Sequence, residues 1–122
     1  MAVERNITSD DDFFLGEDKT LTFTIYQSDG VTPQDITGWA LSWMLKQKGT
    51  DDDDDALVTK TTASGITLTT PASGVCTVSI ADTDTEDLRS NTYRHELKRT
   101  DAGLETVLCH GACQLRQSVH RV

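Results

Sequence analysis

Hydrophobic and polar residues alternate along much of this chain with the two-residue period of a β-strand. The clearest case is the segment Thr92–Leu108, where Tyr93, His95 and Leu97 would lie on one face of a strand. A charged row would lie on the opposite face: Arg94, Glu96 and Lys98. A turn over residues 100–103 follows, and its glycine can adopt the positive φ that short hairpin loops often require. The segment therefore predicts a β-hairpin.

The same alternation predicts strands on both sides of the hairpin. In residues 20–26, Leu21, Phe23 and Ile25 share one side, and mainly threonines fill the other. Residues 39–48 would bury another such row: Trp39, Leu41, Trp43 and Leu45. A helix is the alternative for that segment, but its strand-rich surroundings and the preceding glycine favour a strand. The full set of expected strands is 3–8, 20–26, 39–48, 56–62, 66–70, 75–81, the two arms of the hairpin, and 112–119.

Only residues 82–90 give a convincing helical signal. Thr83 and Glu86 have the spacing of a capping box, and acidic residues gather in the first turn, where the helix dipole stabilises them. This helix would be short and would connect two strands. Roughly seven to nine strands, one short helix and no internal repeat predict an all-β fold, an antiparallel β-sandwich that forms one domain over residues 1–122.

Length and composition agree with a thin, two-layered domain. A chain of 122 residues fits one domain, and a hydrophobic content of 36% suits sheets that each expose one face to solvent. The formal net charge is −9 at pH 7, from 20 acidic and 11 basic residues. Such a chain repels nucleic acid and anionic membranes, so neither is expected as a partner.

The N-terminal residues do not resemble a targeting segment. Met1–Phe14 contains no apolar stretch ahead of its charges, and no window of the sequence has the apolar length of a membrane span. Synthesis in the cytosol without a secretion signal is the resulting expectation.

The three cysteines, an odd number, suit a reducing compartment better than a disulfide framework. Cys109 and Cys113 lie in an extended segment, which separates them by about 13 Å unless a bulge forms at Gly111. Cys76 could approach either of them across strands, and the sequence leaves this open. All three are interpreted as small packing residues.

Two acidic segments are candidates for a metal site, because carboxylate oxygens are preferred ligands of Ca²⁺. The run Asp51–Asp55 lacks the alternating spacing and the glycine of a calcium loop, so a flexible, solvated loop over residues 49–55 is the preferred interpretation. Asp82, Asp84 and Glu86 have better spacing, which the acidic preference of helix N-termini already explains. No metal ligand is assigned.

The histidines offer no recognisable catalytic arrangement. His95, His110 and His120 lack the His-x-x-x-His or Cys-x-x-Cys spacing of metal ligands, and they are interpreted as structural. The sequence contains neither a Gly-x-Ser-x-Gly elbow nor a phosphate-binding loop. We therefore expect no enzyme, no catalytic residue and no cofactor.

Two tryptophans raise the possibility of a sugar-binding platform. Trp39 and Trp43 would serve a carbohydrate-binding or adhesion module if both were exposed. With two Trp, two Tyr and three Phe in the whole chain, at least one of the tryptophans is expected in the core. Edge strands offer a different mode of interaction, which is self-association or docking by strand addition.

The order of turn and strand-start motifs resembles a known family. The motifs are, in chain order, Leu15-Gly16-Glu17-Asp18, Asp35-Ile36-Thr37-Gly38-Trp39, Gly74-Val75, Asp82-x-Asp84-Thr85, Thr92-Tyr93-x-x-Glu96-Leu97-x-Arg99-Thr100-Asp101-x-Gly103, and a final strand containing Gly111. They are similar to those of immunoglobulin-like β-sandwich proteins of tailed bacteriophages and prophages, namely the N-terminal domains of upper baseplate proteins and small virion accessory proteins. The resemblance covers about residues 4–119, and Thr92 stands where most such sequences have glycine.

This resemblance implies an immunoglobulin-like fold and a non-enzymatic structural role in the virion. Such a subunit is assembled in the host cytoplasm and docks on the capsid, neck or tail, as a decoration, connector or baseplate component. Its implied partners are other virion proteins and further copies of itself, with a trimer as one arrangement. A soluble carbohydrate-binding or adhesion module is the alternative, and a hydrolase is a third class that would need a polar pocket.

Overall fold

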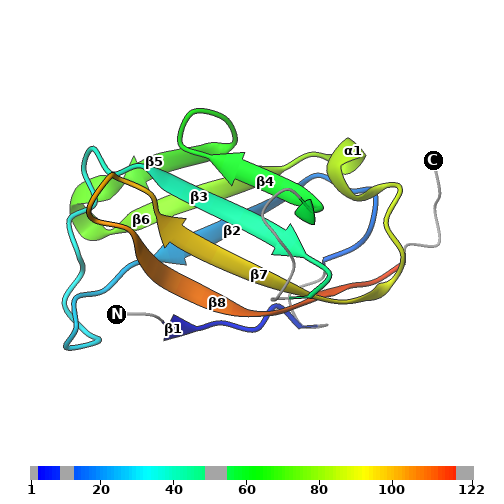
Figure 1. Cartoon of the computed structure of the whole chain (residues 1–122), viewed down its shortest axis with the longest axis horizontal. Coiled ribbons are helices and arrows are strands. Elements are labelled where there is room, and N and C mark those ends of the chain that lie inside the picture. The colour runs from blue at the N-terminus through cyan, green and yellow to red at the C-terminus, as the bar shows by residue number, and fades with distance from the viewer. Residues whose placement is uncertain (1–2, 9–12, 49–54, 118–122) are drawn as a thin grey trace.

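The computed structural model describes residues 3–8, 13–48 and 55–117 and contains two β-sheets packed face to face (Figure 1). The five-stranded sheet contains, in spatial order, β1 (Val3–Glu4), β8 (Thr106–Leu115), β7 (Asn91–Arg99), β3 (Leu41–Lys46) and β4 (Val58–Thr61). The three-stranded sheet contains β2 (Lys19–Thr24), β6 (Val75–Ile80) and β5 (Ile66–Thr70). The prediction of an all-β fold with two sheets is confirmed.

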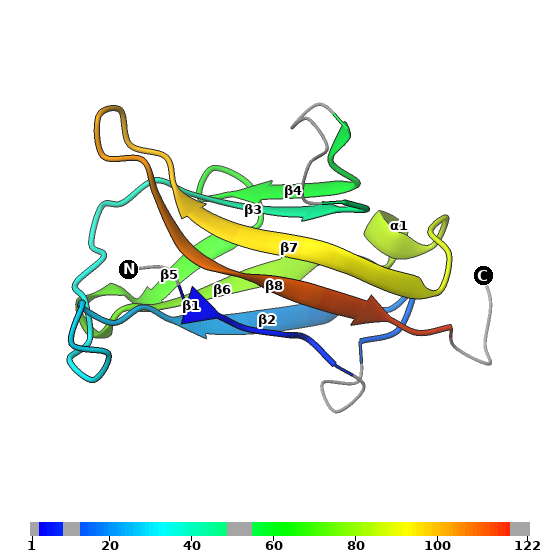
Figure 2. The same cartoon turned by 60° about the horizontal axis from the view of Figure 1, so that its bottom comes forward.

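Neighbouring strands are antiparallel, except that β1 runs parallel to β8. Figure 2 shows the two layers, with β3, β7 and β8 in one and β2, β5 and β6 in the other. A 3-10 turn, η3 (Pro71–Ser73), joins β5 to β6, and the short helix α1 (Asp82–Thr85) follows β6.

The core between the sheets consists of the inward side chains that the alternation predicts. On β2, Leu21 and Phe23 are buried and the threonines between them are exposed. The buried row of β3 is Leu41, Trp43 and Leu45, and that of β7 is Tyr93, His95 and Leu97. Because each strand has one apolar face, burying that face against the other sheet is what brings the two layers together.

The C-terminal hairpin is longer than predicted. The strand expected over residues 112–119 is not separate, because β8 runs without interruption from Thr106 to Leu115 and pairs with β7 over that length. A bulge on β8 lies opposite Leu97 and Lys98, so Leu108 and Cys109 are both buried. Residues 118–119 lie outside the described part of the chain.

The predicted helix is shorter and is capped differently. α1 is a single turn, and the carboxylate of Asp84, not Glu86, accepts a hydrogen bond of 2.7 Å from the N–H of Ala81 at the start of the helix. The predicted capping box of Thr83 and Glu86 is therefore wrong. Buried Thr85 ends the helix, and its hydroxyl accepts the N–H of Gly16 at 2.9 Å, which ties α1 to the start of β2.

The N-terminal segment lies at the edge of the five-stranded sheet, as predicted, although β1 itself is only two residues long. The chain stays extended beyond it, with the N–H of Arg5 and of Ile7 donating to carbonyls of β8. Gly111 makes this close approach possible, because a Cβ atom there would lie 2.2 Å from the carbonyl oxygen of Arg5.

Candidate functional site

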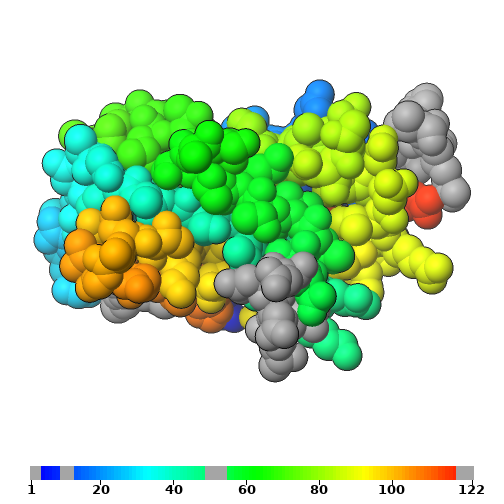
Figure 3. Space-filling model, turned by 45° about the horizontal axis from the view of Figure 1, so that its top comes forward, coloured from blue at the N-terminus to red at the C-terminus, as the bar shows by residue number. Residues whose placement is uncertain are grey.

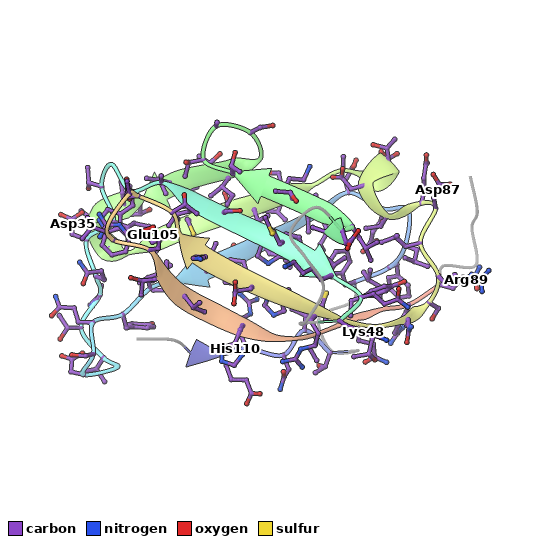
Figure 4. The ribbon with its side chains drawn as sticks, viewed as in Figure 1. Asp35, Lys48, Asp87, Arg89, Glu105 and His110 are labelled. Carbon is purple, nitrogen blue, oxygen red and sulfur yellow. The ribbon has the colours of Figure 1, made fainter. Side chains whose placement is uncertain are left out.

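The outer surface of the five-stranded sheet carries a mixed row of charges, which we call the charged face. Its outward side chains include Glu4, Met44, Lys46, Arg94, Glu96, Lys98 and His110. Arg94 and Glu96 are exposed and Lys98 is half-buried, which confirms the outward row predicted for the hairpin. His110 lies opposite Glu96 on one side and Glu4 on the other, at the margin of the sheet beside β1 (Figure 4).

A shallow hollow of about 170 Å³ lies on the charged face. Lys46 and Arg94 stand directly opposite each other on its rim, and like charges in that position repel. Pockets for small molecules usually measure about 300–1,000 Å³. The hollow is therefore smaller than a usual small-molecule pocket.

His95 lies beneath this face and is 3% exposed. The indole N–H of Trp43 donates to its Nδ1 at 3.2 Å, so Nδ1 carries no proton. The proton of the neutral ring is then on Nε2, which donates to the carbonyl of Arg5 at 2.7 Å. Burial lowers the pKa of His95, and the neighbouring Arg5 and Arg94 act in the same direction. His95 is thus a buried structural residue that ties the N-terminal segment to the core.

Of the other two histidines, only His110 lies within the described residues, and it lines the same hollow as His95. His110 is half-buried on the charged face, on the opposite side of the sheet from the His95 ring. His120 lies outside the described residues.

The two tryptophans do not form an exposed platform. Trp43 is 0% exposed, which confirms that at least one of them belongs to the core. Trp39 is half-buried, and the guanidinium of Arg99 covers its ring at 3.9 Å. Asp101 holds Arg99 at 2.8 Å, and hydrogen bonds from Arg99 and from the N–H of Ala40 keep the pKa of Asp101 below its usual value.

All three cysteines are free thiols and buried, which agrees with their interpretation as packing residues. Burial raises the pKa of the Cys76 thiol to about 11, and the nearby Cys109 adds to this. Burial also raises the pKa of Cys109. Since the thiolate is the reactive form, neither thiol is a nucleophile near neutral pH.

The acidic candidates do not converge on a site. Residues 51–54 of the Asp51–Asp55 run lie outside the described residues, and Asp55 is exposed at the boundary. The Asp84 carboxylate forms an ion pair of 2.8 Å with Lys60, in addition to its bond with the start of α1. Within residues 3–8, 13–48 and 55–117, no group of three His, Cys, Asp or Glu side chains has an arrangement that could hold a metal.

The strand register also defines a second surface, on the outside of the three-stranded sheet. The outer surface of the three-stranded sheet, which we call the hydroxyl face, presents Thr20, Thr22, Thr24, Thr67, Thr70, Val75, Thr77 and Ser79. None of these described side chains carries a charge. The alternating threonines of β2 were visible in the sequence, but the rows across the sheet, such as Thr22–Thr77–Thr67, required the register.

In comparisons with known proteins, neither a family model nor a curated protein matches this sequence. Among the described residues, no helix is long and apolar enough to span a membrane.

Proposed function

We propose that this chain is a non-enzymatic, immunoglobulin-like subunit of a tailed-phage virion, which docks on the capsid, neck or tail. The subunit would be assembled in the host cytoplasm, with other virion proteins as its partners. The resemblance of the ordered sequence motifs is the first support. The strand order, the buried aromatic residues and the charged face add to it.

The strand order agrees with that of an immunoglobulin domain and so supports the proposed fold. Such domains place strands B, E and D in one sheet and C, F and G in the other, where variable-type domains add C′. Here β2, β6 and β5 follow one another as B, E and D do. In the other sheet, β8, β7, β3 and β4 follow one another as G, F, C and C′ do.

Two buried aromatic residues support the same proposal. The hydroxyl of Tyr93, near the start of β7, donates to the carbonyl of Arg89 at 2.6 Å. Immunoglobulin domains have such a tyrosine corner two residues before the second cysteine of their core disulfide. His95 takes that cysteine's position here, and its ring lies 6.2 Å from Phe23 on β2 and 6.1 Å from Trp43 on β3. An aromatic cluster thus stands where many immunoglobulin domains have a disulfide packed against tryptophan.

The charged face is the observation that carries the docking role. Its mixed charges and its small hollow, which Lys46, Arg94 and Glu96 line, offer polar contacts to a complementary protein surface. The alternative of a carbohydrate-binding module loses its main support, because Trp43 is buried and Arg99 covers Trp39.

Analysis of purified particles tests the virion role. We expect mass spectrometry of density-banded virions from the encoding phage or induced prophage to detect the chain, and immunogold labelling to locate it on head, neck or tail. Particles that lack the chain would contradict the proposal.

A second experiment tests the docking face. Particles produced without the chain should take up added wild-type protein, while Arg94→Glu/Lys98→Glu should bind much more weakly. The matched control is Thr20→Glu/Thr77→Glu on the hydroxyl face, which should bind as wild type does. Equal uptake of both variants would exclude the charged face as the docking surface.

A further inference from the structure

We propose that one end of the sandwich binds a protein surface that is rich in lysine and arginine and offers apolar recesses. This end, which we call the loop end, consists of the connections 25–40, 62–65, 71–74 and 100–105. The proposal rests on the virion role and deepens it, because it gives the chemistry of one partner of the subunit.

The loop end carries negative charge only. Its charged residues are Asp29, Asp35, Asp101 and Glu105, and the four connections contain no Lys, Arg or His. Asp101 is paired with Arg99 of β7, whereas the other three acidic residues are exposed. Hydrogen bonds that neighbouring hydroxyl and amide groups donate lower the pKa of Asp29 and of Asp35, so both carboxylates stay ionised near neutral pH.

Exposed apolar side chains accompany these acids. Within the described part of the chain, four large hydrophobic side chains are exposed, and three of them lie at the loop end: Tyr26 at 40%, Val31 at 76% and Leu104 at 53%. The fourth, Leu57, lies at the opposite end, where its N–H donates to the carbonyl of Leu45 on β3. One exposed apolar residue is ordinary on a protein surface, but binding surfaces combine several of them with polar neighbours.

Hydrogen bonds hold the loops in place and tie them to one another. The Asp29 carboxylate accepts the N–H of Val31 at 3.0 Å, which fixes the turn that carries this side chain. The N–H of Thr100 donates to the carbonyl of Ala40 at 2.8 Å, and the N–H of Ala40 donates to Asp101 at 2.9 Å. Loops that are ordered before binding lose less conformational entropy when a partner docks.

The two longer connections meet on the molecular surface. In Figure 3, the cyan segment that precedes β3 and the orange segment between β7 and β8 adjoin at the left of the molecule. Figure 4 places Asp35 and Glu105 at this end and Asp87 at the opposite end. Residues from two distant parts of the sequence thus form one acidic surface.

Charge complementarity selects the partner. An acidic surface attracts lysine and arginine, and it repels nucleic acid, anionic membranes and a second copy of this chain, whose net charge is −9. The exposed side chains of Val31 and Leu104 favour a protein that can bury them. The charged face carries both signs, so only the loop end specifies the sign of its partner.

Uptake by particles that were produced without the chain tests the role of charge. Asp29→Asn/Asp35→Asn/Glu105→Gln removes three charges and keeps the acceptor oxygens that the turns need. It should raise the dissociation constant by about fivefold or more, and added salt should weaken wild-type binding. The matched control is Asp82→Asn/Glu86→Gln/Asp87→Asn at the opposite end, which removes the same charge and should bind as wild type does.

The apolar contact has its own pair of variants. Val31→Ser/Leu104→Ser should also bind more weakly, whereas Leu57→Ser, at the opposite end, should bind as wild type does. A photo-reactive benzophenone amino acid in place of Leu104 should form crosslinks to a segment of another virion protein that is rich in Lys and Arg. Circular dichroism confirms that all variants are folded before they are compared.

The outcomes separate this proposal from the virion role. If particles do not take up wild-type protein, the virion role is contradicted, and the loop-end proposal with it. If they take up wild type and both loop-end variants equally, or if salt strengthens binding, the loop-end proposal alone is overturned. Crosslinks from position 104 only to another copy of the chain, to an acidic protein segment or to nucleic acid would overturn it as well.

Discussion

The two outer faces of this molecule differ in chemistry although the strands beneath them follow the same alternation. On β7 and β3, outward positions carry charge, including Arg94, Glu96 and Lys46. On β2 and β6, outward positions carry hydroxyl groups, including Thr22 and Thr77. Inward positions are apolar in nearly every case. Since folding constrains mainly the inward side chains, the two outer faces are free to differ in chemistry.

The layers behind the two faces differ as well. Behind the charged face, buried His95 links Trp43 to the carbonyl of Arg5 and so fixes the N-terminal segment. Behind the hydroxyl face, the buried residues of β6 are Cys76, Val78 and Ile80, which pack without such a polar link. A buried polar residue thus helps to hold the N-terminal segment in the five-stranded sheet, whereas the described buried residues of β6 include no histidine.

The largest expected effect comes from breaking the fit between the N-terminal segment and the five-stranded sheet. In Gly111→Ala, the new methyl group would meet the carbonyl of Arg5, so the segment must move. We expect a loss of about 1–3 kcal/mol or more in the free energy of unfolding, measured by urea denaturation. The amides of Arg5 and Ile7 should also lose protection from hydrogen exchange, because their bonds to β8 depend on this approach.

Gly30→Ala is the matched control for this prediction. Gly30 has a φ of +77°, and nothing lies within 4 Å of the position that its new methyl group would take, so the substitution costs only the left-handed backbone penalty of about 1–2 kcal/mol. The amides of Arg5 and Ile7 should keep their protection in this variant. Unchanged protection in Gly111→Ala would show that the segment does not depend on the glycine.

The sequence predicted the strands and inward rows well because their alternation is local. It identified the buried rows of β2, β3 and β7 and the outward charges of β7. It did not predict that His95 contacts Arg5, because 90 residues separate them. The capping of α1 was also missed, because Asp84 and Glu86 are both acidic and only the backbone geometry decides which one caps.

The two faces could be predicted only in part, because each one combines residues that are far apart in the sequence. The charged row of β7 is contiguous in sequence, so its outward position followed from periodicity. The hollow beside it needs Met44 and Lys46 from β3 and His110 from β8, which only the register brings together. The hydroxyl face needs the register of three strands that are far apart in the chain.

A smaller effect on stability is expected from protonation of His95, which links Trp43 to the carbonyl of Arg5 behind the charged face. Burial first, and then nearby cations, hold the pKa of His95 below 6.5, so the unfolded chain binds this proton more readily than the folded chain. The free energy of unfolding should therefore be highest above pH 6.5 and should fall as pH decreases toward the lowered pKa. The slope for one proton is at most about 1.4 kcal/mol per pH unit.

Denaturation of wild type and His95→Gln between about pH 5 and 7 measures this effect. Glutamine can accept from Trp43 and donate to Arg5 but does not titrate, so the variant should lose most of the slope. The carboxylates with lowered pKa, such as Asp84 and Asp101, affect stability only below this range, because their ordinary pKa is 3.8. Parallel pH profiles for the two proteins would contradict a neutral His95 in the folded state.

The smallest expected effect is a change in stability when one cation of the charged face is replaced. Arg94 lies opposite Lys46, so Arg94→Glu replaces a repulsive cross-strand pair with an attractive one. The free energy of unfolding should rise by about 0.2–1 kcal/mol in low salt, and the gain should shrink as salt screens the pair. Thr77→Glu on the hydroxyl face has no cation opposite it, because its neighbours are Thr22 and Thr67, and it should give no such gain. If the Arg94→Glu protein is more stable than wild type but does not bind to particles, Arg94 contributes to docking and not to folding. A loss of stability in Arg94→Glu would instead mean that Arg94 stabilises the fold. The charge on this face would then be explained by folding, and no external partner would be needed to explain it.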